Sequence, residues 1–256
     1  PNSIYGPVAS WRLGRSLGVD VLCIDSICSF ECVYCQLGKI NRVTMERDVF
    51  VSTEKILDDL KTSDWREADV ITFSGSGEPT LAINLGIIIG KIKSFTGKPV
   101  IVLTNSTLLH LPEVRKEVAL ADKIFCKLDA WSTETLRRFD RPHKSISLES
   151  IVLGITRLRQ EFKGFLAIQT MILRQPTDFE LERFSVILRS IKPDEVQLNL
   201  PSRPVPKEYF VETRGNAVKA QKEFTRLRTI PKEELKTVKT TLAKLTKLPI
   251  VLRNSA

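Results

Sequence analysis

Three cysteines stand close together near the start of the chain, in the segment Cys28-Ser-Phe-Glu-Cys32-Val-Tyr-Cys35. Thiolates with this C-x3-C-x2-C spacing on one loop can ligate three irons of a 4Fe-4S cube, which leaves the fourth iron open to a reactant. Zinc normally takes a fourth protein ligand, and both His110 and His143 are distant in the sequence. A buried helical stripe would need three cysteines at i, i+4 and i+7 by chance. The spacing therefore favours an open iron–sulfur cluster bound by Cys28, Cys32 and Cys35.

A glycine-rich turn, Ser74-Gly-Ser-Gly-Glu-Pro79, follows the second strand that the sequence predicts. Glycine lets the backbone approach a ligand closely, because it carries no Cβ atom. Glu78 places a carboxylate at the carboxyl end of that strand, where it could hold an ammonium group. The Gly-Lys-Ser/Thr ending of a phosphate-binding loop is absent. The turn therefore indicates either a site for a cationic group or simply a tight loop.

Short apolar segments alternate with helix-like segments through the middle of the chain. The strand candidates, rich in β-branched or aromatic residues, are Gly18–Ile24, Val70–Ser74, Val100–Thr104, Lys123–Leu128, Phe165–Leu173 and Glu195–Leu200. The helix candidates between them are Ser52–Lys61, Ile83–Phe95, Pro112–Ala119, Ser132–Phe139, Leu148–Phe162 and Asp178–Ile191. This alternation implies parallel strands joined by right-handed crossovers. Six such units are too few for a closed eight-stranded barrel, so the sequence predicts an α/β fold, either a doubly wound sheet or a partial barrel.

Polar residues stand at or near the carboxyl ends of the later strands, where barrel enzymes place their sites. They are Asn105, Lys127, Asp129, Gln169, Gln197 and Asn199. Lys127 and Asp129 share one face because side chains alternate along a strand. We expect these residues to contact bound molecules, although each could equally make an ordinary hydrogen bond inside a barrel.

The positive charge of the chain is concentrated near its end. Of the net charge of +9 over 256 residues, the part from Arg203 onward holds +8, with 13 Lys and Arg against 5 Asp and Glu. The segment Pro201-Ser-Arg-Pro-Val-Pro206 interrupts regular structure, and helix-like stretches follow at Ala217–Arg228 and Lys232–Leu245. We expect a basic, mainly helical extension over residues 201–256. It indicates either a phosphate-bearing partner or a solvated helical surface.

The cysteine count and the hydropathy pattern indicate in which cellular compartment the protein is expected. Five cysteines, three of them clustered, argue against a disulfide framework. No apolar run approaches the roughly 20 residues of a membrane helix, and no basic-then-apolar leader opens the sequence. We therefore expect a cytoplasmic protein with no membrane partner.

The cysteine segment and the glycine-rich turn together resemble the two motifs of the radical S-adenosylmethionine (SAM) superfamily. There, a C-x3-C-x2-C motif with an aromatic residue before its last cysteine, here Tyr34, follows the first strand. A GGEP-like sequence, here Gly75-Ser-Gly-Glu-Pro79 with Ser76-Gly77 in place of the Gly-Gly pair, follows the second strand. The resemblance covers residues 18–200. It implies a partial (β/α)6 TIM-like barrel as one domain over residues 1–200.

The resemblance also implies a role for each residue of the first motif. Cys28, Cys32 and Cys35 would ligate a 4Fe-4S cluster, whose open iron would chelate the amino and carboxylate groups of SAM. Tyr34 would lie beside the adenine, and Asp129 would suit the ribose diol. The other polar residues at the strand ends would supply the remaining contacts to SAM or the substrate.

The second motif would receive the ammonium group of SAM. The resemblance assigns this to the backbone of Gly75, Ser76 and Gly77, with the Glu78 carboxylate nearby. Pro79 would stiffen the turn, because its ring fixes φ.

A narrower resemblance lies at the N-terminus. The segment Tyr5–Gly18 resembles the opening of a radical SAM branch related to the archaeal wyosine synthases, which build a tricyclic base on tRNA, although Trp11 stands where that branch usually has Arg. Wyosine synthases carry a second cluster on three further cysteines. Only Cys23 and Cys126 remain here, and both are most simply small apolar residues. The chain is therefore expected to be a relative of these enzymes that lacks their second cluster.

These observations lead to one main functional hypothesis and two alternatives. A radical SAM enzyme would cleave SAM reductively to a 5′-deoxyadenosyl radical, which abstracts hydrogen from a substrate. RNA, tRNA above all, is our expected substrate, bound through the basic C-terminal region, with a ferredoxin or flavodoxin as electron donor. The first alternative is a maturase or activase acting on a protein or peptide. The second is a non-enzymatic iron–sulfur electron carrier, which the missing fourth thiolate argues against.

Overall fold

The computed structural model describes residues 2–23, 25–209, 214 and 223–252. Its main sheet has eight strands in the order β1-β2-β5-β6-β7-β8-β9-β12. β1 (Ile4–Ser10) pairs antiparallel with β2 (Gly14–Val19), and each later pair of neighbours is parallel. The other strands are β5 (Val70–Phe73), β6 (Val100–Thr104), β7 (Lys123–Lys127), β8 (Phe165–Met171), β9 (Glu195–Asn199) and β12 (Ile250–Leu252).

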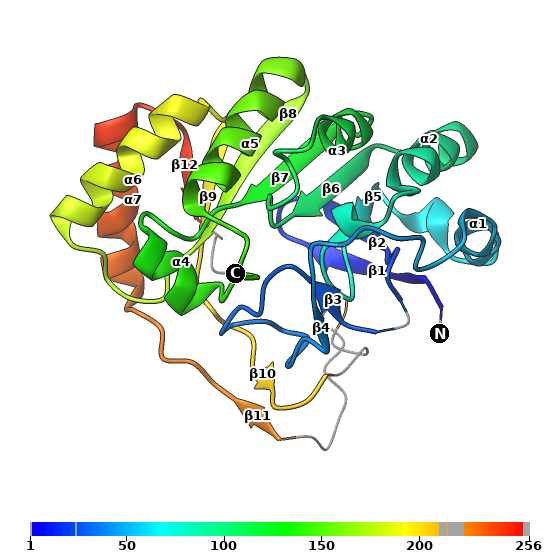
Figure 1. Ribbon diagram of the computed structural model, residues 1–256, viewed down its shortest axis with the longest axis horizontal. Coiled ribbons are helices and arrows are strands. Elements are labelled where there is room, and N and C mark those ends of the chain that lie inside the picture. The colour runs from blue at the N-terminus through cyan, green and yellow to red at the C-terminus, as the bar shows by residue number, and fades with distance from the viewer. Residues whose placement is uncertain (1, 24, 210–213, 215–222, 253–256) are drawn as a thin grey trace.

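The helices that connect these strands lie along the outer face of the curved sheet (Figure 1). They are α1 (Thr53–Lys61), α2 (Leu85–Thr96), α3 (Pro112–Val118), α4 (Thr133–Phe139), α5 (Leu148–Glu161), α6 (Asp178–Ile191) and α7 (Lys232–Thr246). Hydroxyl caps start several of them: Ser147 caps α5 and Thr177 caps α6, each accepting a backbone N–H of the first turn. In the part of the chain that the structure describes, no helix has the length and apolarity that crossing a membrane requires.

The two ends of the sheet order are β1 and β12, and within the described residues they do not pair with each other. The strands therefore form an open, partial barrel rather than a closed one. This confirms the predicted α/β class and the parallel pairing of the six predicted strands. The first of them is shifted: it runs over Gly14–Val19, because the chain leaves the sheet after Val19 and reaches a positive φ of 38° at Cys23.

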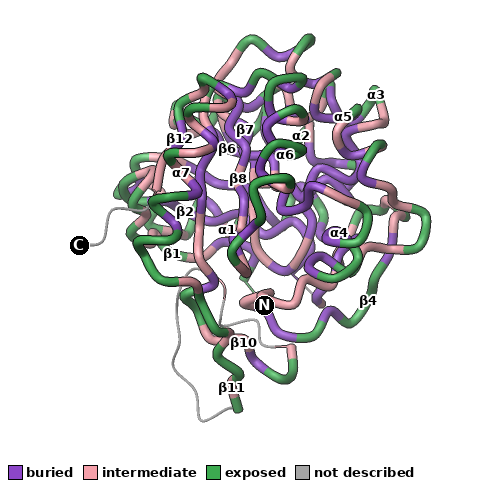
Figure 2. The backbone as a smooth tube through the Cα atoms, turned by 90° about the vertical axis from the view of Figure 1, so that its left-hand side faces the viewer, coloured by how far each residue is buried: buried purple, intermediate pink, exposed green. Residues whose placement is uncertain are grey.

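The two faces of the sheet are packed differently. The outer face and the helices form the main core, and buried residues follow the central strands in Figure 2. On the inner face, a smaller cluster of Ile101, Phe125 and Ala167 packs with Leu13 and other partly buried residues. Ile101, Phe125 and Ala167 stand at the second or third position of their strands, so this part of the inner face is apolar. Polar side chains, among them Asn105 and Asp129, stand beyond the carboxyl ends of the strands, the end at which barrel enzymes place their sites.

The segment after residue 200 adds strands as well as the predicted helix. Helix α7 matches the prediction over Lys232–Leu245, and β12 continues from it to pair in parallel with β9. The prediction of a helix over 217–228 is wrong for its described part: residues 224–225 form β11 (Phe224–Thr225), which pairs with β10 (Val205–Pro206). Residues 217–222 lie outside the described residues. The sheet therefore gains a further strand, β12, that no sequence pattern predicted.

Candidate functional site

The cysteine segment forms a loop that is closed at its base. Cys28 lies in β3 (Ile27–Cys28), which pairs in parallel with β4 (Arg42–Val43) after the loop. Within the loop, the Cys35 N–H donates to the Cys32 carbonyl at 3.0 Å. All three thiols are half-buried and none is in a disulfide. Burial, together with the nearby Glu78 carboxylate, raises the pKa of Cys28 to about 12.

The three cysteines line a large cavity at the carboxyl ends of the strands, with a volume of about 990 Å³. It is at the upper end of the roughly 300–1,000 Å³ that is usual for small-molecule sites. The structure brings most of the predicted site residues to its wall: Tyr34, Gly75, Gly77, Glu78, Asn105, Lys127, Gln169 and Asn199. Ser76, Pro79, Asp129 and Gln197 lie behind this wall. The cavity thus unites the two sequence motifs with the later strand ends.

The glycine-rich turn is hydrogen-bonded to the base of the cysteine loop. The Ile27 N–H donates to the Ser76 carbonyl at 2.9 Å, and the Glu78 N–H donates to the Ile27 carbonyl at 3.1 Å. Gly77 has a φ of 151°, and a Cβ there would stand 1.6 Å from the Ile27 carbonyl oxygen. A side chain at this position is therefore excluded, and the glycine fixes the two motifs side by side.

The Glu78 carboxylate is one of the most heavily hydrogen-bonded groups of the site. It is 1% exposed and accepts from the backbone and hydroxyl of Thr80, the Thr104 hydroxyl and the Asn105 N–H, at 2.6–3.1 Å. Burial raises its pKa, although these donors oppose the rise. With about four lone-pair sites per carboxylate, these contacts leave little acceptor capacity. Through these hydrogen bonds, Glu78 links the glycine-rich turn to the end of β6. Its direct contact with an ammonium group stays a prediction.

Asn105 connects the same strand end to the cysteine loop. Its side-chain amide donates to the Ser29 hydroxyl at 2.7 Å and to the Cys28 sulfur at 3.4 Å. A hydrogen bond to a sulfur atom stabilises negative charge on it. Asn105 therefore contacts a predicted cluster ligand as well as facing the cavity.

A buried group of charges stands behind Tyr34. The Tyr34 hydroxyl lies within hydrogen-bond distance of both the Asp129 and the Asp140 carboxylates, 3.0 Å from the latter, and the Lys127 ammonium lies 4.8 Å from the Tyr34 ring centre. Lys127 also forms an ion pair with Asp129 at 3.1 Å, and the Met171 N–H donates to Asp129 at 2.7 Å. Burial raises the pKa of Asp140 well above its usual value, and the Asp129 charge adds to the rise. Asp129 is thus engaged with protein groups, and its predicted contact with a ribose stays a prediction.

On the next strands, Gln169 and Gln197 bond mainly to each other. The Gln169 amide donates to the Gln197 carbonyl oxygen at 3.0 Å. Gln197 in turn donates to Glu195 at 2.8 Å and is 2% exposed. Of this pair, only Gln169 faces the cavity.

A second buried hydrogen-bond network is centred on Asp20, and the sequence analysis did not predict it. Its carboxylate accepts from the Ser76 N–H at 3.0 Å, the Ser76 hydroxyl at 2.6 Å and Arg214 at 2.7 Å. The Tyr209 hydroxyl donates to the Ser76 hydroxyl at 3.0 Å. An acid inside the apolar run Val19-Asp-Val-Leu-Cys23 is the signal that could have predicted a buried carboxylate.

The cysteine loop fits a 4Fe-4S cluster better than a single metal ion. A mononuclear zinc site normally takes four protein ligands around one ion, whereas this loop supplies three thiols. A cubane instead takes one thiolate at each of three corners, which suits three separate half-buried thiols around a cavity. The fourth corner would face that cavity. This is the arrangement that an open iron needs.

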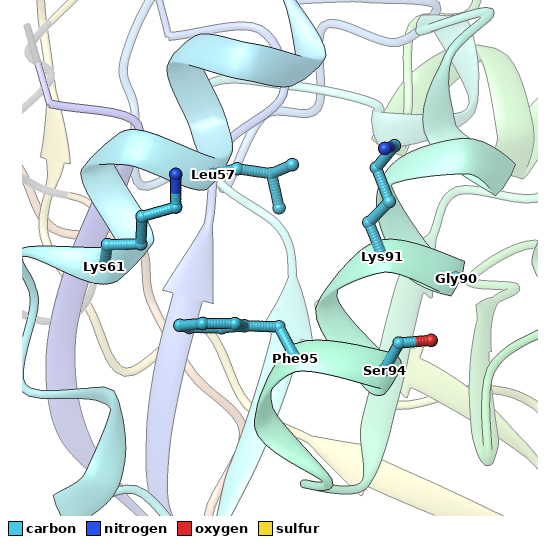
Figure 3. A pocket seen from close by; sticks show the side chains of 6 residues that line it. All are labelled: Leu57, Lys61, Gly90, Lys91, Ser94 and Phe95. Atoms are coloured by element: carbon cyan, nitrogen blue, oxygen red, sulfur yellow. The ribbon is translucent and has the colours of Figure 1, made fainter.

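A smaller pocket of about 390 Å³ lies away from this site. It is a shallow groove between α1 and α2, lined by Leu57, Lys61, Gly90, Lys91, Ser94 and Phe95 (Figure 3). These helices lie on the outer face of the barrel, and none of the cysteine or glycine motif residues reaches the groove. It therefore takes no part in the site.

Comparison with known proteins agrees with this site. The sequence profile of the radical SAM superfamily matches residues 24–185. The UPF0026 protein slr1464 of Synechocystis is 53% identical over 215 residues, which cover 84% of this chain and 81% of that protein. A probable GTP 3′,8-cyclase of Saccharolobus islandicus is 29% identical over 159 residues, which cover 59% of this chain and 49% of that protein.

Solved structures show the same fold at low sequence identity. Streptococcus suis SuiB bound to the precursor peptide SuiA superposes with a TM-score of 0.63 at 12% identity, covering 94% of this chain and 50% of that one. This chain thus spans about half the length of the cyclase and of SuiB. The profile match covers well over half of the chain, and it coincides with the cysteine loop, the glycine-rich turn and the partial barrel. This protein belongs to the radical SAM superfamily, whose enzymes use a 4Fe-4S cluster and SAM.

Proposed function

We propose that this radical SAM enzyme acts on RNA, tRNA above all. The observation that carries the proposal is the position of basic side chains. Arg203, Lys232 and Lys236, from the basic C-terminal segment, line the same cavity as the three cysteines. A phosphate-bearing substrate bound by that segment would reach the reactive site directly. The name of the relative GTP 3′,8-cyclase, which specifies a nucleotide, supports the same substrate chemistry.

The residues around the cavity would divide the work as follows. Cys28, Cys32 and Cys35 hold the cluster, and the backbone of Gly75 and Gly77 faces the cavity to receive an ammonium group. When bound, the cluster and SAM supply a 5′-deoxyadenosyl radical that abstracts hydrogen from the substrate. The apolar side chains of Phe30, Leu37 and Ile40 in the cavity wall exclude water around the reacting groups.

Two groups of side chains would hold the parts of the site in fixed positions relative to one another. Glu78 holds the glycine-rich turn against β6, and Lys127 and Asp129 hold the Tyr34 ring at the cavity wall. Their side chains are fixed by packing and hydrogen bonds before any ligand arrives, which is the usual requirement for preorganised binding.

The first prediction concerns SAM affinity. We expect Glu78→Gln and Asp129→Asn each to weaken SAM binding by about tenfold, because each disturbs charge-assisted hydrogen bonds that position the cavity wall. Iron content should stay near that of the wild type, since neither residue is a cluster ligand. Isothermal titration of SAM into reconstituted protein, with iron analysis, measures both quantities.

Asp122→Asn is the matched control for these variants. This carboxylate pairs with Lys93 at 2.9 Å, and the Lys93 and Asp122 side chains are 36% and 42% exposed. Its loss should leave SAM affinity unchanged. Wild-type SAM affinity in both site variants would show that the pocket has been placed wrongly.

The second prediction concerns docking of RNA. The C-terminal segment carries five basic side chains around the start of α7, and they differ in their position relative to the cavity: Arg226, Arg228, Lys232, Lys236 and Lys239. Lys232 and Lys236 line the cavity, whereas Arg226, Arg228 and Lys239 do not. The latter three are the outer basic set.

We expect tRNA affinity to fall steeply with salt, because phosphate contacts release counterions. Replacing the outer basic set by Gln should reduce the magnitude of the slope of log K against log salt by roughly 2, at about 0.7 per phosphate contact. Cluster content and SAM cleavage should survive. An anisotropy titration of labelled tRNA at several salt concentrations tests this, and wild-type protein without salt-dependent binding would refute the RNA substrate.

A peptide substrate, as in SuiB bound to SuiA, is the competing function for this fold. A peptide would become the preferred substrate class if the protein did not bind RNA. A ferredoxin or flavodoxin as electron donor and a cytoplasmic location complete the proposal. Half-buried free thiols that must stay reduced to hold a cluster support that location.

A further inference from the structure

The side chain of Asn105 is held in one orientation at the wall of the large cavity. Asn105 follows β6 directly and is 8% exposed. Its side-chain oxygen accepts from the Thr107 backbone N–H at 3.1 Å and from the Thr107 hydroxyl at 2.8 Å. Because a backbone N–H can only donate, the oxygen of the amide must face Thr107, and its nitrogen must face the opposite way.

The amide nitrogen of Asn105 points at the cysteine loop. It donates to the Ser29 hydroxyl at 2.7 Å and to the Cys28 sulfur at 3.4 Å. The Phe30 backbone N–H donates to the same sulfur, also at 3.4 Å. The Cys28 sulfur therefore receives two N–H groups, of which one comes from a different strand end and is fixed by contacts outside the loop.

The surroundings strengthen the electrostatic effect of this contact. Asn105 is buried, and a hydrogen bond in a medium of low dielectric constant is electrostatically stronger than one in water. The Asn105 backbone N–H donates to the Glu78 carboxylate at 2.6 Å, so a buried negative charge lies beside the same residue. That charge opposes further negative charge nearby, and the side-chain amide of Asn105 partly offsets its effect at the Cys28 sulfur.

We propose that Asn105 raises the reduction potential of the cluster through its hydrogen bond to Cys28. Reductive cleavage of SAM requires the bound cluster to accept one electron from a donor protein. That electron adds negative charge to the cluster and its thiolates, so a donor to a ligand sulfur stabilises the reduced state more than the oxidised one. Hydrogen bonds to the sulfurs are among the factors that set the potential of an iron–sulfur cluster.

This role goes beyond the proposed function, because it concerns the cluster and holds for any substrate. Asn105 acts on the iron through a ligand and is therefore a positioning residue. No proton and no ligand is exchanged at Cys28 when the electron arrives. The titration that tests the role contains neither SAM nor RNA, so its result is independent of whether RNA is the substrate and of whether Asn105 also contacts SAM.

The test compares two Asn→Leu variants. Asn105→Leu keeps a side chain of similar size but removes the N–H donor. Asn84→Leu is the matched control: Asn84 is 7% exposed, its amide donates to the Val51 carbonyl at 3.0 Å and the Thr53 hydroxyl at 3.2 Å, and it does not line the cavity. Each protein is reconstituted anaerobically, its iron and sulfide are counted, and the cluster is titrated with dithionite at controlled potential, with the reduced state followed by electron paramagnetic resonance.

We expect the equilibrium constant for one-electron reduction to fall about tenfold in Asn105→Leu, because a hydrogen bond to a charged group is removed. For one electron, this corresponds to a potential lower by about 59 mV. Asn84→Leu should lose stability but keep the wild-type potential. A wild-type potential in Asn105→Leu with a full cluster, or an equal fall in both variants, would overturn the proposal.

Asn105→Asp decides the question if Asn105→Leu does not hold a cluster. A carboxylate at this position can still accept from Thr107 and from the Ser29 hydroxyl, but it has no N–H for the Cys28 sulfur. At alkaline pH, where the introduced carboxyl group is ionised, the potential should fall by at least as much as for Asn105→Leu. An unchanged potential would refute the role. Loss of the cluster from both variants would make Asn105 a purely structural residue and would refute it equally.

Discussion

Replacing any one of Cys28, Cys32 and Cys35 by Ala should abolish the iron–sulfur cluster. Reconstituted wild-type protein should hold about four irons and four sulfides per chain, and each variant should fall close to zero. The reason is that each thiolate would hold one iron of the cubane, and the two other cysteines, Cys23 and Cys126, do not line the cavity. Iron and sulfide analysis after anaerobic reconstitution, together with the visible absorption of the cluster, checks this.

The two remaining cysteines are the controls. Cys23 and Cys126 are buried, do not line the cavity, and should be replaceable by Ala with the cluster intact. Burial raises the pKa of Cys126 to about 12, as it does for Cys28, so burial alone does not make a thiol a ligand. A full cluster in the Cys32→Ala protein would overturn the assignment of the site.

The second large effect is expected at the ion pair between Asp20 and Arg214. Asp20 is 1% exposed and the Arg214 side chain is 10% exposed, so the pair is shielded from water. Arg214→Met leaves a buried carboxylate without its counter-charge, which should cost about 3–5 kcal/mol in the free energy of unfolding. At the usual 2–4 °C per kcal/mol for a chain of this size, the midpoint of thermal unfolding should fall by on the order of 10 °C.

SAM affinity should fall in the same variant, because Asp20 also accepts both hydrogen bonds of Ser76 in the glycine-rich turn. Arg15→Gln is the control: its ion pair with Glu67 is exposed on both sides, at 54% and 58%, and its loss should cost less than about 1 kcal/mol. The double variant Arg214→Met with Asp20→Asn should lose less free energy of unfolding than the two single variants lose together. An additive result would show that the two side chains do not interact.

Local spacing explains why the centre of the site could be predicted. The cysteines lie within eight residues and the glycine-rich turn within six, so each motif is complete before the chain folds. The position of both motifs follows from the parallel strands, whose carboxyl ends meet at one edge. Cys28, Gly77 and Asn105 lie where that reasoning placed them.

The parts that could not be predicted depend on distant partners. Arg214 contacts Asp20 from 194 residues away, and Asp140 reaches Tyr34 across 106 residues. The hydrogen-bond donors of Glu78 include Thr104 and Asn105 from another strand end, so they depend on how the strands are aligned in the fold. No local sequence pattern encodes that alignment. The missed strands have weak patterns for a similar reason: β12 has only three residues, and β1 contains Gly6 and Pro7.

Strand β12 has a consequence for biosynthesis. Until α7 and β12 have left the ribosome, β9 is the last strand of the growing sheet, and Val196, Gln197 and Leu198 have no partner on that side. These residues are buried in the finished fold, so the nascent chain presents an apolar, unpaired edge of the kind that pairs with other chains. Pairing with β12, the last of the described strands along the chain, covers this edge.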